Sequence, residues 1–331
     1  MQVRPSTFSI VARDPETDAV GVAVQSKFVG VGAVVPFVSA DAGAIATQSY
    51  ANVAYGPDGL DLLRDGHDAE TVVDRLTDDD AEAPSRQVGI VGADGSVAAF
   101  TGKECHEYAG DLQGTDYTVQ GNILENAETL TAMAETFEAT DAGLPERLLA
   151  ALHAGNEAGG DKRGEQSAAL YVAKPAGGYD GRNDRWIDVR VDDHERPIDE
   201  LERVFKIYDV TLLEREPPAD TRTLSGAAAS EVADLLTALG YADEPQDDSA
   251  DPAGGAADTA DADETSGTDD ATFGERERAA LETFRGMNNF ENHPVPVLED
   301  AIARGWEAAE GEGETRLVDA VWHGLSRLDR V

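Results

Sequence analysis

Cysteine, metal-ligand spacing and long apolar runs are scarce or missing in this chain of 331 residues, and each scarcity excludes a class of protein. Cys105 is the only cysteine, which excludes an intramolecular disulfide and favours a reducing, cytoplasmic interior. No run approaches about 18 consecutive apolar residues, and no signal-peptide pattern is visible, so we expect a protein without a membrane span. The histidines lack zinc-ligand spacing and the Gly-x-Gly patterns lack a strand–turn–helix context, so we expect no metal and no cofactor.

Positive charge is the next scarcity. The chain has 66 acidic and 26 basic residues, a net charge of −40 and a pI near 4.2. Its lysines are Lys27, Lys103, Lys162, Lys174 and Lys206. Such a surface repels phosphates and anionic lipids, which excludes nucleic acid and membranes as partners. We therefore expect a halophilic protein that folds in molar salt, where the Debye length shortens to about 3 Å.

Apolar periodicity and turn signals predict an α+β fold. Expected strands cover 7–12, 20–26, 32–38, 43–48, 87–91, 97–101, 117–121, 167–173 and 187–191. Expected helices cover 59–65, 68–77, 127–139, 144–155 and 197–206, with Asp68 as an N-cap and a chain break at 55–57. This order is neither a regular βαβα alternation nor an all-β chain, and it suits two antiparallel sheets packed together with helices outside.

Composition divides the chain into four parts. We expect a main domain over 1–225, a short helix over 226–240, and a small helical module over 274–331. Between the last two, residues 241–273 hold 11 acidic residues and no basic one. Such a segment cannot bury enough apolar surface to order itself, so we expect a disordered acidic linker.

Several stretches resemble the Ntn-hydrolase-like family known as domain of unknown function 1028. They are TFSIVA (7–12), GVAVQSKF (21–28), GAVVP (32–36), AIATQ (44–48), YGP (55–57), QGNIL (120–124), GDKRGEQSAA (160–169) and DVRVDDH (188–194). The resemblance covers about 7–210 and implies a four-layer αββα sandwich. The tail stretch 284–292 resembles the small C-terminal module of some members, which is sometimes described as peptidoglycan-binding-like.

The resemblance makes Thr7 the candidate nucleophile. In the wider superfamily, a residue exposed at a new N-terminus attacks an amide carbonyl, and its own α-amine, with a pKa of about 7.7–8, accepts the proton. Thr7 opens the first expected strand, but Met1–Ser6 precede it. Either these six residues are removed or the protein does not use this mechanism, and Thr7 is then an ordinary β-branched strand residue. Ser6 and Ser9 are the next candidates.

Two further stretches carry candidate catalytic residues. Ser26 and Lys27 close the second expected strand, where Lys27 is either a group that lowers the pKa of the nucleophile or a solvated lysine. Gln120 to Asn122 follow a strand, so Asn122 and nearby backbone amides form either an oxyanion hole or a helix N-cap.

The charged loop over 160–167 completes the set. Asp161 is suited to orient the amine, and Arg163 to bind a substrate carboxylate through two hydrogen bonds; the alternative is a charged surface loop. Gln48 and Ser167, in stretches that carry the resemblance, are added as substrate-binding residues. Outside this set, Asp188, Arg190 and Asp192 share a strand face as an ion-pair network or a second site, and Cys105 with His106 is a weaker nucleophile–base pair.

Two functions remain open at this stage. The first is an Ntn-type amidohydrolase that cleaves the C–N bond of a small, carboxylate-bearing substrate. The second is a non-catalytic protein that keeps the fold and binds a metabolite or assembles as an oligomer; we expect a homo-oligomer. The Ser26–Lys27 and Asp161–Arg163 pairs favour the first function, and the residues that precede Thr7 favour the second.

Overall fold

The computed structural model describes residues 7–242 and 273–330, in two compact units, Met1–Val204 and Phe205–Val331. It is a mixed α+β structure with two antiparallel sheets, and the described residues form nine α-helices. The first unit therefore ends before residue 225, where the composition placed a domain boundary. The expected linker, 241–273, lies almost wholly outside the described residues.

A six-stranded antiparallel sheet has the first strand near its centre. Its order is β10 (Arg185–Val191), β9 (Ser167–Ala173), β2 (Ala19–Ser26), β1 (Thr7–Asp14), β8 (Tyr117–Asn122) and β7 (Gly110–Gly114). The register pairs Thr7 with Ser26 on one side and with Asn122 on the other. Residues far apart in sequence thus meet at one end of β1.

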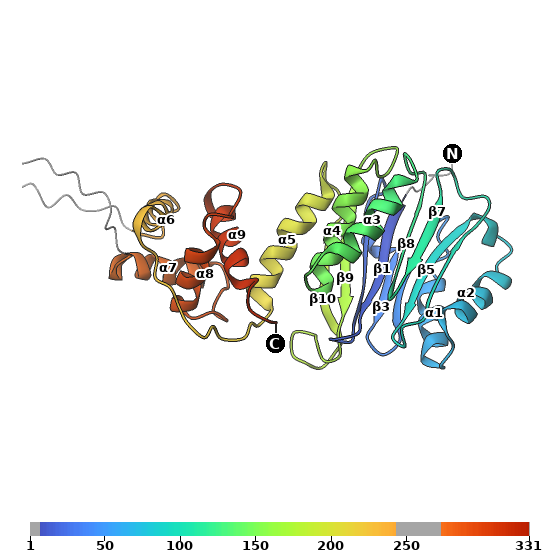
Figure 1. Ribbon diagram of the computed structural model, residues 1–331, viewed down its shortest axis with the longest axis horizontal. Coiled ribbons are helices and arrows are strands. Elements are labelled where there is room, and N and C mark those ends of the chain that lie inside the picture. The colour runs from blue at the N-terminus through green and yellow to red at the C-terminus, as the bar shows by residue number, and fades with distance from the viewer. Residues whose placement is uncertain (1–6, 243–272, 331) are drawn as a thin grey trace, which may run out of the picture. The chain divides into compact units, whose positions relative to one another are not determined.

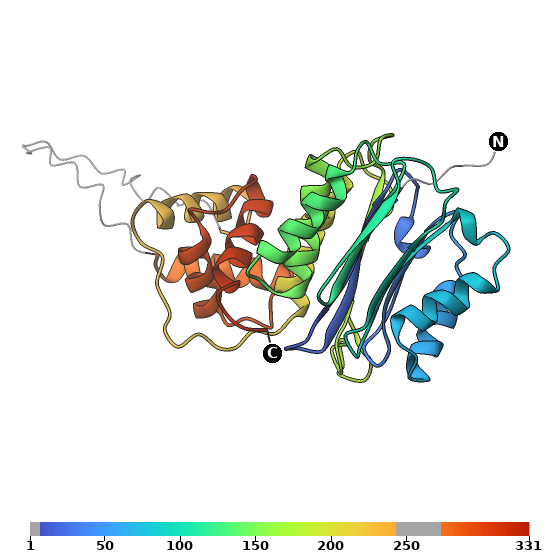
Figure 2. The ribbon, with the colours of Figure 1, turned by 45° about the vertical axis from the view of Figure 1, so that its right-hand side comes forward.

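The second sheet has four strands and faces the first (Figure 2). Its order is β3 (Pro36–Ser39), β4 (Gly43–Ser49), β5 (Arg86–Gly92) and β6 (Val97–Thr101). Small and β-branched side chains fill most of the space between the sheets, among them Val22, Val24, Ala46 and Val91. The strand interiors read as nearly continuous apolar runs because both faces of each sheet are covered.

Helices cover the outer faces of the two sheets (Figure 1). The pair α3 (Glu128–Ala139) and α4 (Leu144–Glu157) packs on the six-stranded sheet, and the pair α1 (Tyr55–Arg64) and α2 (Ala69–Asp78) packs on the four-stranded sheet. Asp68 caps α2 as predicted, because its carboxylate accepts a hydrogen bond from the Thr71 amide at 2.8 Å.

The structure corrects two predicted elements and adds one. The expected chain break at 55–57 is wrong, because Tyr55 begins α1 and Pro57 lies in its first turn, where a missing amide hydrogen costs nothing. The expected strand over 32–38 is shorter, since a 3₁₀ turn, η1 (Val31–Ala33), precedes β3. Strand β7 was not predicted; it is an edge strand with Leu112 as its one apolar side chain, so it has no apolar alternation.

The second unit is helical. It begins within the sequence of helix α5 (Pro197–Leu212), at Phe205. Four more helices follow: α6 (Gly226–Ala238), α7 (Glu275–Met287), α8 (Val295–Gly305) and α9 (Gly313–Leu325). Phe284, Phe290, Leu298 and Trp306 are among the buried residues of its core. None of the helices in the described part of the chain has the length and apolarity to cross a bilayer.

Arginines neutralise the buried carboxylates of this unit. The carboxylate of Asp209 is fully buried and pairs with Arg215 and with Arg330, the latter at 2.8 Å. Asp300 pairs with Arg304 at 2.7 Å and with Arg327 at 2.5 Å. A planar guanidinium satisfies both oxygens of a carboxylate, which a lysine cannot do, and this accounts for part of the preference for arginine.

Candidate functional site

A cavity of about 290 Å³ lies at the end of β1, between the ends of the two sheets. It is lined by Thr7, Phe28, Val31, Val34, Val35, Gln48, Ser49, Tyr50, Ala51 and Arg86. These residues come from β1, from the segment between β2 and β3, and from the adjacent ends of β4 and β5. The nucleophile candidate Thr7 and the binding candidate Gln48 therefore share one cavity.

Thr7 sits where the sheet register brings three strand ends together. Its side-chain hydroxyl donates a hydrogen bond to Ser26 Oγ at 3.1 Å, and the residue is 1 % exposed. The amide groups of Gln48 and Asn122 lie 3.4 and 3.5 Å from the Thr7 carbonyl oxygen. The structure thus brings together four of the predicted residues, although Asn122 is the last residue of β8 and caps no helix.

A buried network of amide side chains joins the two sheets behind Thr7. Gln87 Oε1 accepts hydrogen bonds at 2.9 Å from both Gln48 and Asn122. Ser9 Oγ donates to Gln48 at 2.6 Å and accepts from Gln120 at 2.6 Å. Since buried polar groups without partners are costly, this network fixes the orientation of β1 against the second sheet.

A glycine makes room for this network. A Cβ on Gly89 would lie 2.1 Å from Gln120 Oε1, closer than any contact allows. Glycine in β5 therefore permits the close approach of the Gln120 amide, which any larger residue would displace.

The loop candidates Asp161 and Arg163 hold one wall of the cavity without lining it. Asp161, whose side chain is fully buried, accepts hydrogen bonds from the backbone amides of Lys27 at 2.8 Å and Arg163 at 2.9 Å. The Arg163 guanidinium reaches the Lys27 carbonyl oxygen at 3.3 Å. Ser167 acts on the same segment, because its hydroxyl donates to the Phe28 carbonyl and accepts from the Val31 amide at 3.2 Å. All three are positioning residues for the segment after β2.

The other predicted candidates do not line the cavity. Lys27 is exposed, and its Nζ donates to the Glu165 carbonyl oxygen at 2.8 Å. Burial raises the pKa of the Cys105 thiol, which makes it a poor nucleophile, and its Sγ contacts the Arg86 carbonyl oxygen. Asp188 pairs with Arg185 at 3.2 Å on the outer strand β10.

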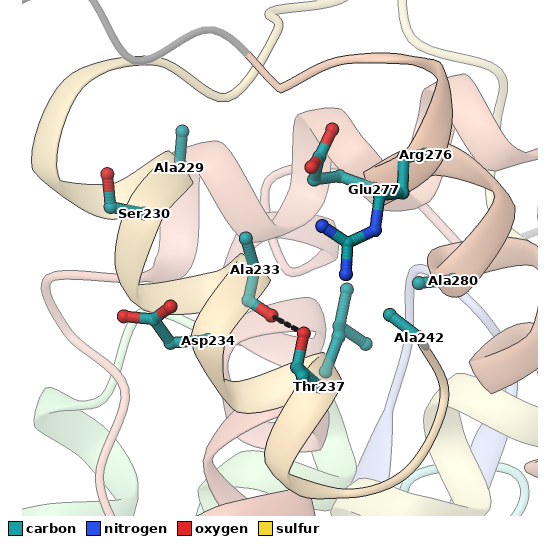
Figure 3. A pocket seen from close by; sticks show the side chains of 10 residues that line it. Ala229, Ser230, Ala233, Asp234, Thr237, Ala242, Arg276, Glu277 and Ala280 are labelled. Carbon is teal, nitrogen blue, oxygen red and sulfur yellow. Dashed lines mark hydrogen bonds between the residues drawn. The ribbon is translucent and has the colours of Figure 1, made fainter. Parts of the chain in front are cut away.

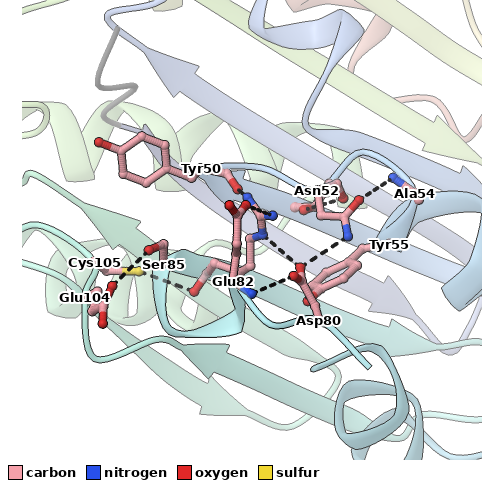
Figure 4. Close-up of polar contacts among 11 residues, drawn as sticks. Tyr50, Asn52, Ala54, Tyr55, Asp80, Glu82, Ser85, Glu104 and Cys105 are labelled. Carbon is pink, nitrogen blue, oxygen red and sulfur yellow. Dashed lines mark hydrogen bonds and ion pairs between the residues drawn. The ribbon is translucent and has the colours of Figure 1, made fainter. Parts of the chain in front are cut away.

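Arg86 borders the cavity and carries two carboxylate partners. Its guanidinium pairs with Asp80 at 2.9 Å and with Glu82 at 2.6 Å, and it donates to the Tyr50 carbonyl oxygen. Figure 4 labels these three partners, Tyr50, Asp80 and Glu82. The hydrogen bond from Arg86 is the largest cause that lowers the pKa of Asp80 to about 2. Beside it, Ser49 is buried and has a φ of 69°, in the left-handed region. This conformation is uncommon for a serine and persists only where the surrounding contacts hold the backbone in it.

The lowered pKa of Asp80 predicts an acid-sensitive contribution to stability. Because the folded-state pKa lies below the unfolded value of about 3.9, this contribution is complete above about pH 4 and disappears as the pH falls towards 2. We expect Asp80→Asn to remove about 1–2 kcal/mol of unfolding free energy at pH 7 and less at low pH. Urea unfolding between these pH values at constant high salt measures it.

The matched control for Asp80 is Glu82→Gln. The Glu82 side chain is 74 % exposed, so its loss is expected to change stability by less than about 0.5 kcal/mol at every pH. An equal loss for Asp80→Asn at acid and neutral pH would contradict the assigned pKa.

Two other cavities differ from the first in their lining. One, of about 530 Å³ beside α1 and α2, is lined by Asp58, Asp61, Asp65, Asp79 and Asp80 among others. Another, of about 320 Å³, lies between α6 and α7 of the second unit, and its lining includes Asp234, Arg276 and Glu277 together with several alanines (Figure 3). Among the described residues no three His, Cys, Asp or Glu side chains are arranged to hold a metal ion.

Sequence reasoning missed several residues of the Thr7 site. Gln87 was read only as the start of a strand, and Ser49, Tyr50 and Arg86 were not singled out. The signal was present: a glutamine stands at the end or in the middle of otherwise apolar strands at 48, 87 and 120. A polar residue in a strand that is buried on both faces points to an internal network.

Comparisons with known proteins agree on the first unit. The model of a family of unknown function, DUF1028, matches residues 7–201, more than half of the chain. Among solved structures, the crystal structure of protein SPO2555 from Silicibacter pomeroyi, a DUF1028 protein, is similar with 35 % sequence identity and a TM-score of 0.57. That match covers 62 % of this chain and 86 % of SPO2555. No curated protein matches the sequence.

Proposed function

Since the chain belongs to the family of unknown function DUF1028, we propose that its first unit is an Ntn-type amidohydrolase in which Thr7 attacks an amide carbonyl of a small substrate. The observation that carries the proposal is the position of Thr7. It is the first residue of a central strand, it lines a cavity of about 290 Å³, and its hydroxyl is held by Ser26. The proposal assigns the order of helix pair, sheet, sheet and helix pair in this unit to the αββα sandwich of Ntn-type hydrolases.

The proposed reaction requires a new N-terminus at Thr7. Hydrolysis of the Ser6–Thr7 peptide bond converts the Thr7 amide nitrogen into an amine, with a pKa of about 7.7–8. This amine takes the proton of Thr7 Oγ1 as the oxygen bonds to the substrate carbonyl carbon, and the proton then passes to the departing amine as the C–N bond breaks. Water hydrolyses the resulting ester and restores the hydroxyl.

The neighbouring residues hold Thr7 for this attack. Ser26 accepts the hydrogen bond of the Thr7 hydroxyl, and the amide groups of Gln48 and Asn122 approach its carbonyl oxygen. In the proposal Asp161, Arg163 and Ser167 position the cavity wall, and Lys27 has no role because its side chain is exposed and bound to Glu165 O. A nucleophile fixed in one rotamer loses less entropy on reaching the transition state.

The test is a covalent label. We expect a β-lactone, which acylates hydroxyl nucleophiles, to add to Thr7 of protein whose mass shows that residues 1–6 are gone. Thr7→Ala is expected to lose the label completely, whereas Thr7→Ser keeps it because the hydroxyl remains. Thr17→Ala, in the exposed turn between β1 and β2, is the matched control and is expected to label like the parent.

Intact mass decides between the proposal and its alternative. A folded protein that reacts with substrates or with the β-lactone while its Ser6–Thr7 bond is intact has no α-amine at Thr7, and the mechanism is then wrong. A protein that keeps this bond and never labels is explained by the second candidate function, a metabolite-binding protein. That candidate is favoured by the six residues that precede Thr7 in the sequence.

A further inference from the structure

The cavity beside Thr7 has an apolar wall. Phe28, Val31, Val34 and Val35 come from the single segment between β2 and β3, and Ala51 comes from the loop after β4. Val31 and Val35 are 1 % and 3 % exposed, so their side chains face the cavity and the core and not the solvent. An apolar wall of this kind favours a hydrocarbon part of a ligand.

The same cavity has no carboxylate in its lining. None of its lining residues is acidic, although one residue in five of the chain is acidic, and the two other cavities described above both carry carboxylates. Its cation, Arg86, is already paired with Asp80 and Glu82, so a carboxylate of a ligand finds no free positive charge here. An ammonium group finds no carboxylate either, because neither Asp80 nor Glu82 lines the cavity.

The cations that suggested a carboxylate substrate lie elsewhere. The Arg163 guanidinium is 3.3 Å from Asp161 and from the Lys27 carbonyl oxygen, and Lys27 Nζ is on the Glu165 carbonyl oxygen. Neither residue lines the cavity. The sequence-based expectation of a carboxylate on the substrate thus loses the contacts on which it depended.

The wall is fixed before any ligand arrives. Gly30 has a φ of 67°, and its amide donates to the Asp192 carbonyl oxygen at 2.9 Å. The Val31 amide donates to Ser167 Oγ at 3.2 Å, and the Val35 carbonyl oxygen accepts from the Thr47 amide at 3.1 Å. A preformed wall avoids the entropic cost of ordering a loop on binding, so it selects ligands by shape.

We infer that this cavity is the acyl-side pocket of the substrate and that it takes a short, uncharged aliphatic acyl group; this inference rests on the proposed function. A charged end group would lose its hydration in the pocket without gaining a partner. Each methylene that fits tightens binding by roughly fourfold. The volume of about 290 Å³ is at the lower end of ligand sites, which limits the group to a short chain.

Simple primary amides test the pocket without any reaction. The probes are butanamide, hexanamide, the monoamide of adipic acid and the amide of ε-aminocaproic acid, measured by calorimetry. The measurements are made in about 1 M KCl, because the net charge of the chain would otherwise repel the anion and attract the cation. We expect hexanamide to bind about tenfold or more tightly than either charged analogue and more tightly than butanamide.

Substitutions in the wall locate the binding. Val34→Trp fills the cavity and is expected to abolish hexanamide binding, whereas Val29→Trp, in the same segment but 57 % exposed and outside the lining, leaves it unchanged. Ala51→Leu fills the opposite side and gives a second test if Val34→Trp does not fold. Equal affinity for a charged analogue, or full hexanamide affinity in a folded Val34→Trp protein, would overturn the inference.

The pocket and the chemistry fail separately. The β-lactone label on Thr7 tests the nucleophile, whereas hexanamide binding by the parent protein tests the pocket. Selective amide binding in a protein that never labels removes the proposed nucleophile and keeps the pocket. A β-lactone label on Thr7 that forms equally well with aliphatic and carboxylated lactones keeps the nucleophile and removes the pocket.

Discussion

Asp161→Ala is expected to lower the unfolding free energy of the first unit by about 3 kcal/mol and to abolish the binding of hexanamide. The Asp161 carboxylate is fully buried and accepts hydrogen bonds from two backbone amides, those of Lys27 and Arg163. Its removal leaves both amides and the Arg163 guanidinium without this acceptor. The segment after β2, which forms the cavity wall, then loses its attachment at the end where it leaves the sheet.

The matched substitutions separate the carboxylate from the loop around it. Asp161→Asn keeps one acceptor oxygen but points amide hydrogens at Arg163, so we expect an intermediate loss of about 1–2 kcal/mol. Lys27→Ala, one residue after β2, removes an exposed side chain and is expected to change stability by less than about 0.5 kcal/mol. Denaturant unfolding gives the free energies, and calorimetry gives the hexanamide affinity.

Two results would contradict the roles given to Asp161 and Lys27. If Asp161→Ala keeps the parental hexanamide affinity while it loses stability, the loop does not set the shape of the cavity. If Lys27→Ala instead abolishes the Thr7 label, the lysine has the catalytic role that the sequence suggested. Its side chain would then have to adopt, during the reaction, a rotamer other than the exposed one seen in the structure.

Most strands could be predicted because two sequence signals agree in them, the β-branched residues within the strand and the turn residues at its ends. β1, β2, β9 and the β5–β6 hairpin combine β-branched residues with turn residues at their ends, and their predicted ranges are confirmed within two residues. β3 was predicted too long because Gly32 and Ala33 lie between apolar residues and do not interrupt the pattern. Their 3₁₀ turn depends on hydrogen bonds that the Val31 and Gly30 amides donate to Ser167 in β9 and to Asp192 after β10, which are distant in sequence.

The candidate site was predicted in part for a related reason. Thr7 was predicted because the family resemblance implies a nucleophile at the start of the first strand. Ser26 and Asn122 were predicted because they stand at or just after the end of a recognisable strand, and antiparallel pairing brings these positions together. The roles of Asp161 and Ser167 were not found, because a charged or polar residue beside a strand looks the same whether it binds a substrate or a loop. Only the contacts with Lys27, Phe28 and Val31 show that they hold the cavity wall.

The charge of the whole chain gives the last prediction, a fold that depends on salt. With a net charge of −40, like charges crowd the surface, as five aspartates do around the cavity beside α1 and α2. Between about 1 M and 0.1 M KCl the Debye length grows from about 3 to 10 Å, so repulsion reaches several neighbours instead of one. We expect the unfolding free energy to fall by about 5 kcal/mol or more over this range, which is the whole stability of many domains.

Substitutions of aspartate distinguish surface repulsion from the loss of specific pairs. Asp58→Asn with Asp65→Asn, both exposed beside that cavity, is expected to raise stability at low salt and to leave it unchanged at high salt. Asp300→Asn removes a buried carboxylate that pairs with Arg304 and Arg327, and is expected to destabilise the second unit equally at all salt concentrations. Thermal unfolding in a KCl series measures both. A melting temperature independent of KCl would show that this acidic surface has no role in adaptation to salt.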